Sequence, residues 1–366
     1  MNATFPFGFP GPTAFYLTAY VATLVIHLLF MNYVMAGCGY LVVAGIRADG
    51  LARTERDVSI AAVLRDWMPF AVSAAITAGV APLLFIQILY RHPFYTANLL
   101  LFHRWMAILP ALIAGFYLLY VFRSERVLGW SPLPRVLVIL GAFACFGFTG
   151  WSWSENHLLG LRSGAWAELY GSSAMTFRDP ELLPRIAVWL LGSIPTLSVL
   201  VAWQLHHLQS HGKAAVKAGE PRRLALFAMA GLALTIAAGG WYYGQGGSPL
   251  RTALTGQLAG PYAAAAFTGM ILQGAAWAWQ WRGAELTAKP LAMASTGVVL
   301  TLCGAAVVRE ARRLQSLDAS EFFEEHRQAF AVGGLWVFLA FFLVNAGLIC
   351  FCVWIVKRET RRAPAS

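Results

Sequence analysis

Long apolar stretches with almost no charge recur along the whole chain and constrain its fold more than any other feature. A helix needs about 20 apolar residues to cross the hydrocarbon core of a bilayer. Nine stretches approach or exceed this length, at residues 14–46, 67–90, 98–122, 136–153, 186–205, 224–244, 261–281, 291–308 and 331–356. We therefore expect an all-α integral membrane protein, a bundle of about nine transmembrane helices that forms one polytopic domain over residues 1–366.

The composition supports this class and excludes water-soluble enzyme folds. Hydrophobic residues make up 58% of the chain and charged residues only 12%, whereas soluble domains carry about 25% charged residues. The net charge of +10 does not indicate nucleic-acid binding, because the basic residues lie in short segments between the apolar stretches. The sequence Cys-x-x-Cys-His is absent, so covalent attachment of a c-type haem is not expected.

The distribution of basic residues predicts an orientation. Of the 27 Lys and Arg residues, 17 fall in one alternate set of loops and in the C-terminal tail. The positive-inside rule then places the C-terminus in the cytoplasm and the N-terminus outside. The expected location is the cytoplasmic (inner) membrane of a bacterium. Because no Lys or Arg precedes Arg47, we interpret the first stretch as a retained helix rather than a signal peptide.

His27 is the main candidate ligand because it lies midway along the first apolar stretch. A polar ring at membrane depth is a functional candidate, and neutral imidazole is a good ligand for haem iron. The alternative is a structural histidine bonded to a neighbour such as Asn32 or Gln87. The sequence alone leaves both interpretations open.

Two further groups lie near the predicted outer ends of helices. His103 could be a second haem ligand and Arg104 could bind a haem propionate, or the pair could extend to interfacial water. The cluster Arg309-Glu310-Ala311-Arg312-Arg313 could bind propionates or an anionic partner, or anchor to lipid headgroups. We interpret the other histidines, including His157 in an expected external loop, as solvated. A group of acidic residues lies in the next loop: Asp318, Glu321, Glu324 and Glu325. It could dock a basic cytochrome, or it could only keep the loop in contact with water.

Taken in order, these segments resemble subunit I of cytochrome bd quinol oxidase, a nine-span haem protein with an external N-terminus. The resemblance covers most of the chain through short motifs. They are Tyr20 to Gly37 around His27, Ile86-Gln87-Ile88 through Phe94-Tyr95-Thr96, Trp153-Ser154-Glu155-Asn156, Asp179-Pro180 with Arg185, and Gly304 to Arg313. The resemblance implies a bd-like fold, with His27 as a haem ligand and a quinone as a further cofactor.

Several positions depart from the family's pattern. Val188 falls near the position of the family's low-spin haem histidine. Phe267 falls near the position of the Met that is its partner, with Met270 one turn further on, and Pro110 near that of a Glu in the family's proton route. Arg309 replaces the ligating Glu of the eighth segment, and Glu310 is one step out of register. The segment matching the long quinol-binding loop is cut to about residues 245–260. We therefore expect a divergent relative that does not reduce oxygen.

Three functions follow as hypotheses. The first is a subunit with one haem b that relays electrons between the quinone pool and a periplasmic c-type cytochrome or iron–sulfur protein. It would be an oxidoreductase subunit rather than an enzyme on its own. Its site would comprise His27, His103, Arg104, Met270, Glu310 and Arg312. The second is a haem-free membrane anchor of a multi-subunit redox complex. The third, a transporter or channel, has little support because charges are almost absent from the stretches.

Overall fold

The computed structural model describes residues 5–6, 8–47, 50–52, 57–172, 174–212, 214–316 and 319–362. A long helix occupies each of the nine predicted stretches. These helices are α1 (Gly11–Arg47), α2 (Ile60–Leu89), α4 (Phe102–Arg123), α6 (Pro132–Gly160), α8 (Leu182–Ser210), α9 (Glu220–Gln245), α11 (Gly260–Arg282), α12 (Ala288–Ser316) and α14 (Gly334–Arg362).

Short elements connect the long helices. They are the helices α3 (Arg91–Leu100), α5 (Glu125–Leu128), α7 (Trp166–Gly171), α10 (Gly247–Thr255) and α13 (Ala319–Ala331), the 3-10 turn η1 (Ser163–Ala165), and the strands β1 (Asp57–Val58) and β2 (Ala215–Val216). The two strands pair in parallel, Asp57 opposite Ala215, and so join the segment before α2 to the segment before α9.

The all-α membrane class is confirmed. Within the described ranges, seven helices are long and apolar enough to cross a membrane: α1, α2, α4, α6, α8, α9 and α12. An eighth candidate is a bent pair, Phe322–Ala331 with Trp336–Val344, whose parts meet at 64°. The expected number of nine spans, the single domain and the orientation of the termini stay predictions.

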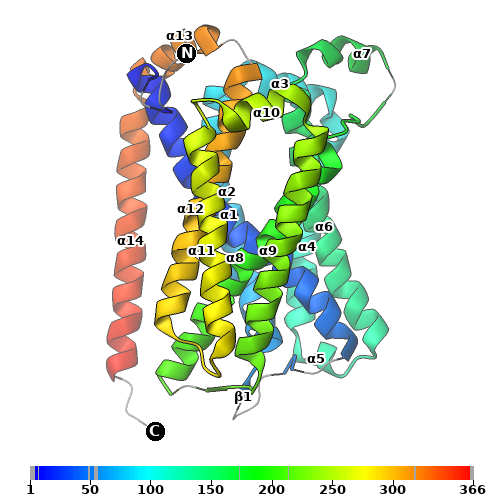
Figure 1. The fold of residues 1–366 in the computed structure, drawn as a ribbon, viewed down its shortest axis with the longest axis vertical. Coiled ribbons are helices and arrows are strands. Elements are labelled where there is room, and N and C mark those ends of the chain that lie inside the picture. Colours follow the sequence, from blue (N-terminus) through cyan, green and yellow to red (C-terminus); the bar gives the residue numbers. More distant parts are fainter. Residues whose placement is uncertain are drawn as a thin grey trace.

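The long helices run roughly side by side along the long axis of the molecule (Figure 1). The N-terminus, α3, α7, α10 and α13 lie at one end, which we call the N-terminal end. The C-terminus, α5 and β1 lie at the opposite end, the C-terminal end (Figure 1). The loops predicted to be external therefore gather at the N-terminal end, together with the polar residues described below.

Close backbone contact joins α11 to α12. A Cβ atom built on Gly269 would lie 2.5 Å from the carbonyl oxygen of Gly297, and one built on Gly304 would overlap Tyr262 and Ala266. Small residues permit this approach between helices in a membrane, where packing rather than the hydrophobic effect drives association.

The outward surface of the bundle is apolar: Leu109 and Tyr117 of α4 are 64% and 65% exposed. Such a surface fits contact with the lipid bilayer.

Candidate functional site

His27 lies on α1 and its ring packs directly against α2. Its Nδ1 atom is 2.9 Å from the carbonyl oxygen of Ala75. A carbonyl only accepts hydrogen bonds, so Nδ1 carries the proton and Nε2 keeps its lone pair. The ring fits because residue 79 is glycine: a Cβ there would lie 3.0 Å from the Cε1 and Nδ1 atoms of His27. The helix pair α1–α2 therefore fixes the tautomer and orientation of His27.

The neighbours considered as structural partners of His27 are engaged elsewhere. Asn32 donates to the hydroxyl of Thr196 over 3.3 Å, joining α1 to α8. Gln87 accepts a hydrogen bond of 3.1 Å from the hydroxyl of Tyr95. His27 is thus held by the backbone of α2 rather than by a polar side chain.

The face of α1 that carries His27 leads to a group of arginines at the N-terminal end. Tyr20 precedes His27 by seven residues, or two helical turns, which is about 10 Å along the axis on the same face. Its hydroxyl accepts a hydrogen bond from Arg309 of α12, whose guanidinium also lies over the Tyr20 ring at 5.7 Å. Residues 309–313, predicted to follow a span, instead lie inside α12.

Glu310 is completely buried between two arginines. Its carboxylate oxygens lie 3.0 Å from Nε of Arg309 and 3.2 Å from Nη1 of Arg313. The Arg313 guanidinium in turn stacks over the ring of Tyr90, 4.3 Å from its centre. Burial raises the pKa of Tyr90 well above its usual range, so this phenol stays neutral. Both oxygens of Glu310 are therefore already engaged.

Arg312 joins α12 to the segment before α8. It donates to Glu181 and to the hydroxyl of Tyr242, each over 2.6 Å. Glu181 also accepts from Arg162 over 2.8 Å, and Arg162 pairs with Asp179 at 3.2 Å. The side chains of Arg312 and Glu181 are 6% and 3% exposed, so this is an ion pair within the protein and not a headgroup anchor.

His157 and Arg185 form a further contact close to these arginines. Arg185 donates from Nη1 to the Nδ1 atom of His157 over 2.8 Å. Since Nδ1 accepts, the proton of the neutral ring is on Nε2, which is buried and has no hydrogen-bond partner among the described residues. His157 was expected in a solvated loop. That expectation is wrong, because α6 continues to Gly160 and buries the side chain to 8% exposure.

The group as a whole carries an excess of positive charge. We define the arginine cluster as Arg162, Arg185, Arg309, Arg312 and Arg313 with the carboxylates of Asp179, Glu181 and Glu310, that is, five cations and three anions. Arg309, Arg312 and Arg313 all lie close enough to repel Arg185 electrostatically. No described carboxylate lies within ion-pair distance of Arg185. The cluster is therefore suited to an anionic group.

His103 and Arg104 begin α4 and lie outside this cluster. His103 is exposed and its ring contacts Phe102, with 5.7 Å between centroids. Arg104 lies 3.1 Å from the buried carboxylate of Glu155, which also accepts a 2.6 Å hydrogen bond from the Phe177 amide. Arg104 is thus already paired with a carboxylate, while the roles of both residues toward a haem stay predictions.

Met270 belongs to a different helix pair from His27. It follows Gly269, where α11 meets α12, and packs against the larger apolar core cluster, which includes Trp277 and Val298. Phe267, one turn earlier, is 60% exposed and faces out of the bundle. The structure therefore places Glu310 and Arg312 in two separate ion-pair groups of α12, and the printed contacts of Met270 and His103 belong to neither group. No group of three or more potential metal-binding side chains is found in the described ranges.

Sequence reasoning missed most partners of the arginines, including Tyr20, Tyr90, Glu181 and Tyr242. The available signal was the density of arginines in 309–313, which demands nearby acceptors if the segment is buried. In the acidic group, Asp318 lies outside the described residues and nothing is described for the Glu321 side chain. Glu324 pairs with Arg327 at 2.8 Å on the surface of α13.

Comparison with known proteins identifies the fold. No protein-family model and no curated protein sequence matches the chain. Among solved structures, the fold is similar to bd oxidase from Geobacillus thermodenitrificans, with a TM-score of 0.57 over 96% of this chain and 99% of that chain. The two sequences are 12% identical. The chain therefore has a bd-oxidase-like fold, as the resemblance of its motifs predicted.

Proposed function

We propose that the chain is a haem b electron-transfer subunit of a membrane-bound respiratory complex, with His27 as the axial ligand of the haem iron. The observation that carries this proposal is the hydrogen bond from His27 to the Ala75 carbonyl. Ligating histidines donate their second N–H to a carbonyl or carboxylate in this way, which orients the ring and raises its basicity. Nε2 of His27 is left as the donor atom for iron.

The arginine cluster fits the other end of a haem. Haem b carries two propionates, and the cluster has two more guanidinium than carboxylate groups. Arg185 and the unpartnered Nε2–H of His157 are the donors best suited to a carboxylate, because neither has a carboxylate partner among the described residues. The bound haem would supply one-electron redox chemistry, while the chain supplies ligation, burial and compensating charge.

Electron transfer would connect the quinone pool with a periplasmic c-type cytochrome or iron–sulfur protein. The bd-oxidase-like fold supports a respiratory setting, since the structural neighbour is an oxidase. The arginine cluster lies at the N-terminal end, which the charge distribution assigns to the external side of the membrane. We infer a subunit that works within a complex and that does not reduce oxygen: Glu310 is engaged by two arginines and Phe267 faces outward.

A haem-free anchor is the second candidate function. It is favoured by the completeness of the Glu310 and Glu181 ion pairs, which tie α12 to the start of α8 and to α1 without any cofactor. In this case the arginine cluster would serve only to stabilise the bundle, and His27 would be a structural histidine.

The pyridine haemochrome assay with reduced-minus-oxidised spectra of the purified protein separates the two functions. We expect a b-type spectrum in the wild type, its loss in His27→Ala, and its retention in His92→Ala, which changes an exposed histidine outside the bundle core. His103→Ala tests the second ligand through a shift between low-spin and high-spin bands. A wild type that folds without haem would establish the anchor, and a spectrum that survives His27→Ala would move the ligand elsewhere.

A further inference from the structure

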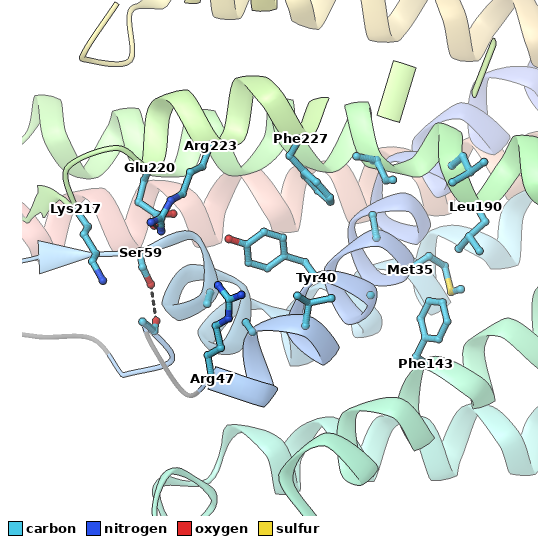
Figure 2. Close-up of a pocket in the computed structure, with 18 residues that line it drawn as sticks. Met35, Tyr40, Arg47, Ser59, Phe143, Leu190, Lys217, Glu220, Arg223 and Phe227 are labelled. Atoms are coloured by element: carbon cyan, nitrogen blue, oxygen red, sulfur yellow. Dashed lines mark hydrogen bonds and ion pairs between the residues drawn. The ribbon is translucent and has the colours of Figure 1, made fainter. Parts of the chain in front are cut away.

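A cavity of about 530 Å³ lies beside the last turns of α1, up to Arg47, at the opposite end of this helix from the arginine cluster. Figure 2 shows the residues that line it. The cavity is bordered by α1, α6, α8, α9 and the segment that leads into α2. Its size falls in the range of small-molecule sites, about 300–1,000 Å³. Nothing in the proposed electron-transfer function uses it.

The interior of the cavity is apolar. Met35 and Phe143 lie at one end and Phe227 packs edge-on against Tyr40, with 5.5 Å between ring centroids (Figure 2). Val43 at the border is 65% exposed, so the cavity opens sideways at a surface that would face lipid. An elongated hydrocarbon group can therefore enter from the bilayer without leaving an apolar environment.

The opposite part of the cavity is basic. Arg47, Lys217 and Arg223 line it together with a single carboxylate, that of Glu220 (Figure 2). Glu220 is already used within the protein, since it accepts a 3.2 Å hydrogen bond from the Ile60 amide and lies 3.2 Å from Arg223. The lining thus carries three cations and one carboxylate, a net positive charge, and one of the cations, Arg223, is paired with that carboxylate. The first turns of α2 and α9 also begin here, and helix N-termini favour negative charge.

We propose that this cavity binds one anionic phospholipid, with its phosphate at Arg47, Lys217 and Arg223 and an acyl chain along Met35, Phe143 and Phe227. Arginine binds phosphate through charge-assisted hydrogen bonds. Basic pockets between transmembrane helices suit anionic headgroups, especially on the cytoplasmic side, where the charge distribution places this end. A zwitterionic lipid or a quinone would gain less from the three cations, because neither carries a net negative charge.

Native mass spectrometry of the detergent-solubilised protein, titrated with phosphatidylglycerol or phosphatidylcholine, tests the proposal. Each basic residue near a headgroup contributes about fivefold in affinity. We expect wild type to prefer phosphatidylglycerol, and Arg47→Gln/Lys217→Gln to lose about 25-fold in phosphatidylglycerol affinity on that basis. The matched control is Arg282→Gln/Lys289→Gln, which removes the same charge from exposed positions at the same end and should leave the preference unchanged.

A second variant tests the apolar part independently of charge. A Cβ atom at Gly39 would lie 3.8 Å from Phe143, so Gly39→Leu fills the cavity without a backbone clash. We expect Gly39→Leu to weaken the binding of both lipids, whereas Gly147→Leu, at a helix position with open space, should leave the binding of both unchanged. Thermal unfolding verifies that each variant is folded. Equal affinity of wild type for the two lipids, or wild-type binding by a folded Gly39→Leu or by the double charge variant, would overturn the proposal.

Discussion

Arg185, in the first turn of α8, donates a 2.8 Å hydrogen bond to the ring of His157, near the end of α6. This contact joins two helices across the segment 161–181 and leaves the histidine proton on a buried Nε2 atom. It also places Arg185, which has no carboxylate partner in the described part of the chain, close to three other arginines. The pair therefore ties α6 to α8 and adds a buried positive charge to the arginine cluster.

Replacing His157 by leucine should destabilise the protein through Arg185. The guanidinium would lose its acceptor in a buried position, at a cost of about 2 kcal/mol in the free energy of unfolding. The double variant His157→Leu/Arg185→Met should be more stable than His157→Leu, because it also removes the unpaired cation. Denaturant unfolding in detergent, followed by tryptophan fluorescence, measures the difference. Equal free energies of unfolding for His157→Leu and for the double variant would show that His157 and Arg185 are not coupled.

Replacing Glu181 by glutamine should have a larger effect. Arg312 would lose the carboxylate of Glu181 in a buried position, and loss of one partner of a buried ion pair costs about 3–5 kcal/mol. The control is Glu324→Gln, which breaks the exposed pair with Arg327 and should leave stability unchanged. Thermal unfolding of both variants in the same detergent decides the matter: equal midpoints would contradict a structural role for Glu181.

Gly79→Val should displace the ring of His27. The new Cβ would lie 3.0 Å from Cε1 and Nδ1, so the ring must move and its 2.9 Å bond to Ala75 would break. We expect a lower ratio of haem to protein, together with a loss of about 1–3 kcal/mol from overpacking. Gly147→Val is the control, since open space surrounds that residue. Haem content and a difference spectrum identical to wild type would argue against His27 as the ligand.

Gly269→Val should separate α11 from α12. Its Cβ would lie 2.5 Å from the Gly297 carbonyl oxygen, and backbone cannot rotate aside as a side chain can. We expect the folded, monodisperse fraction in size-exclusion chromatography to fall sharply. Gly274→Val lies on the same helix with open space around it and should behave like wild type. If both variants elute alike, the close approach of the two helices does not limit stability.

Much of the helical architecture could be predicted from local sequence, because a transmembrane helix satisfies its own backbone hydrogen bonds and needs only an apolar run of sufficient length. This reasoning located all nine long helices, and α1 to within a few residues. It did not locate the end of α6. The polar run Glu155-Asn156-His157 is typical of a loop, yet its side chains are buried by partners distant in sequence, such as Asn98, which accepts from Asn156 over 2.5 Å.

The candidate site, too, could be predicted from the sequence only in part. His27 could be selected from the sequence because an imidazole in an apolar helix is rare and expensive, and the arginines of 309–313 because they are dense. The sequence could not show that Ala75 and Gly79 receive the His27 ring, nor that Tyr20, Tyr90 and Glu181 surround the arginines. Those residues are ordinary in their local context, and only helix packing brings them into contact.

The sequence by itself determined the class of protein, since composition and the length of apolar runs decide which solvent a helix can occupy. It also determined which few polar side chains lie within the apolar stretches. Only the tertiary structure decided how those groups are neutralised and oriented. Charge compensation and ring orientation act over a few ångströms between helices far apart in the chain, and no periodicity along one helix records which neighbour it will meet.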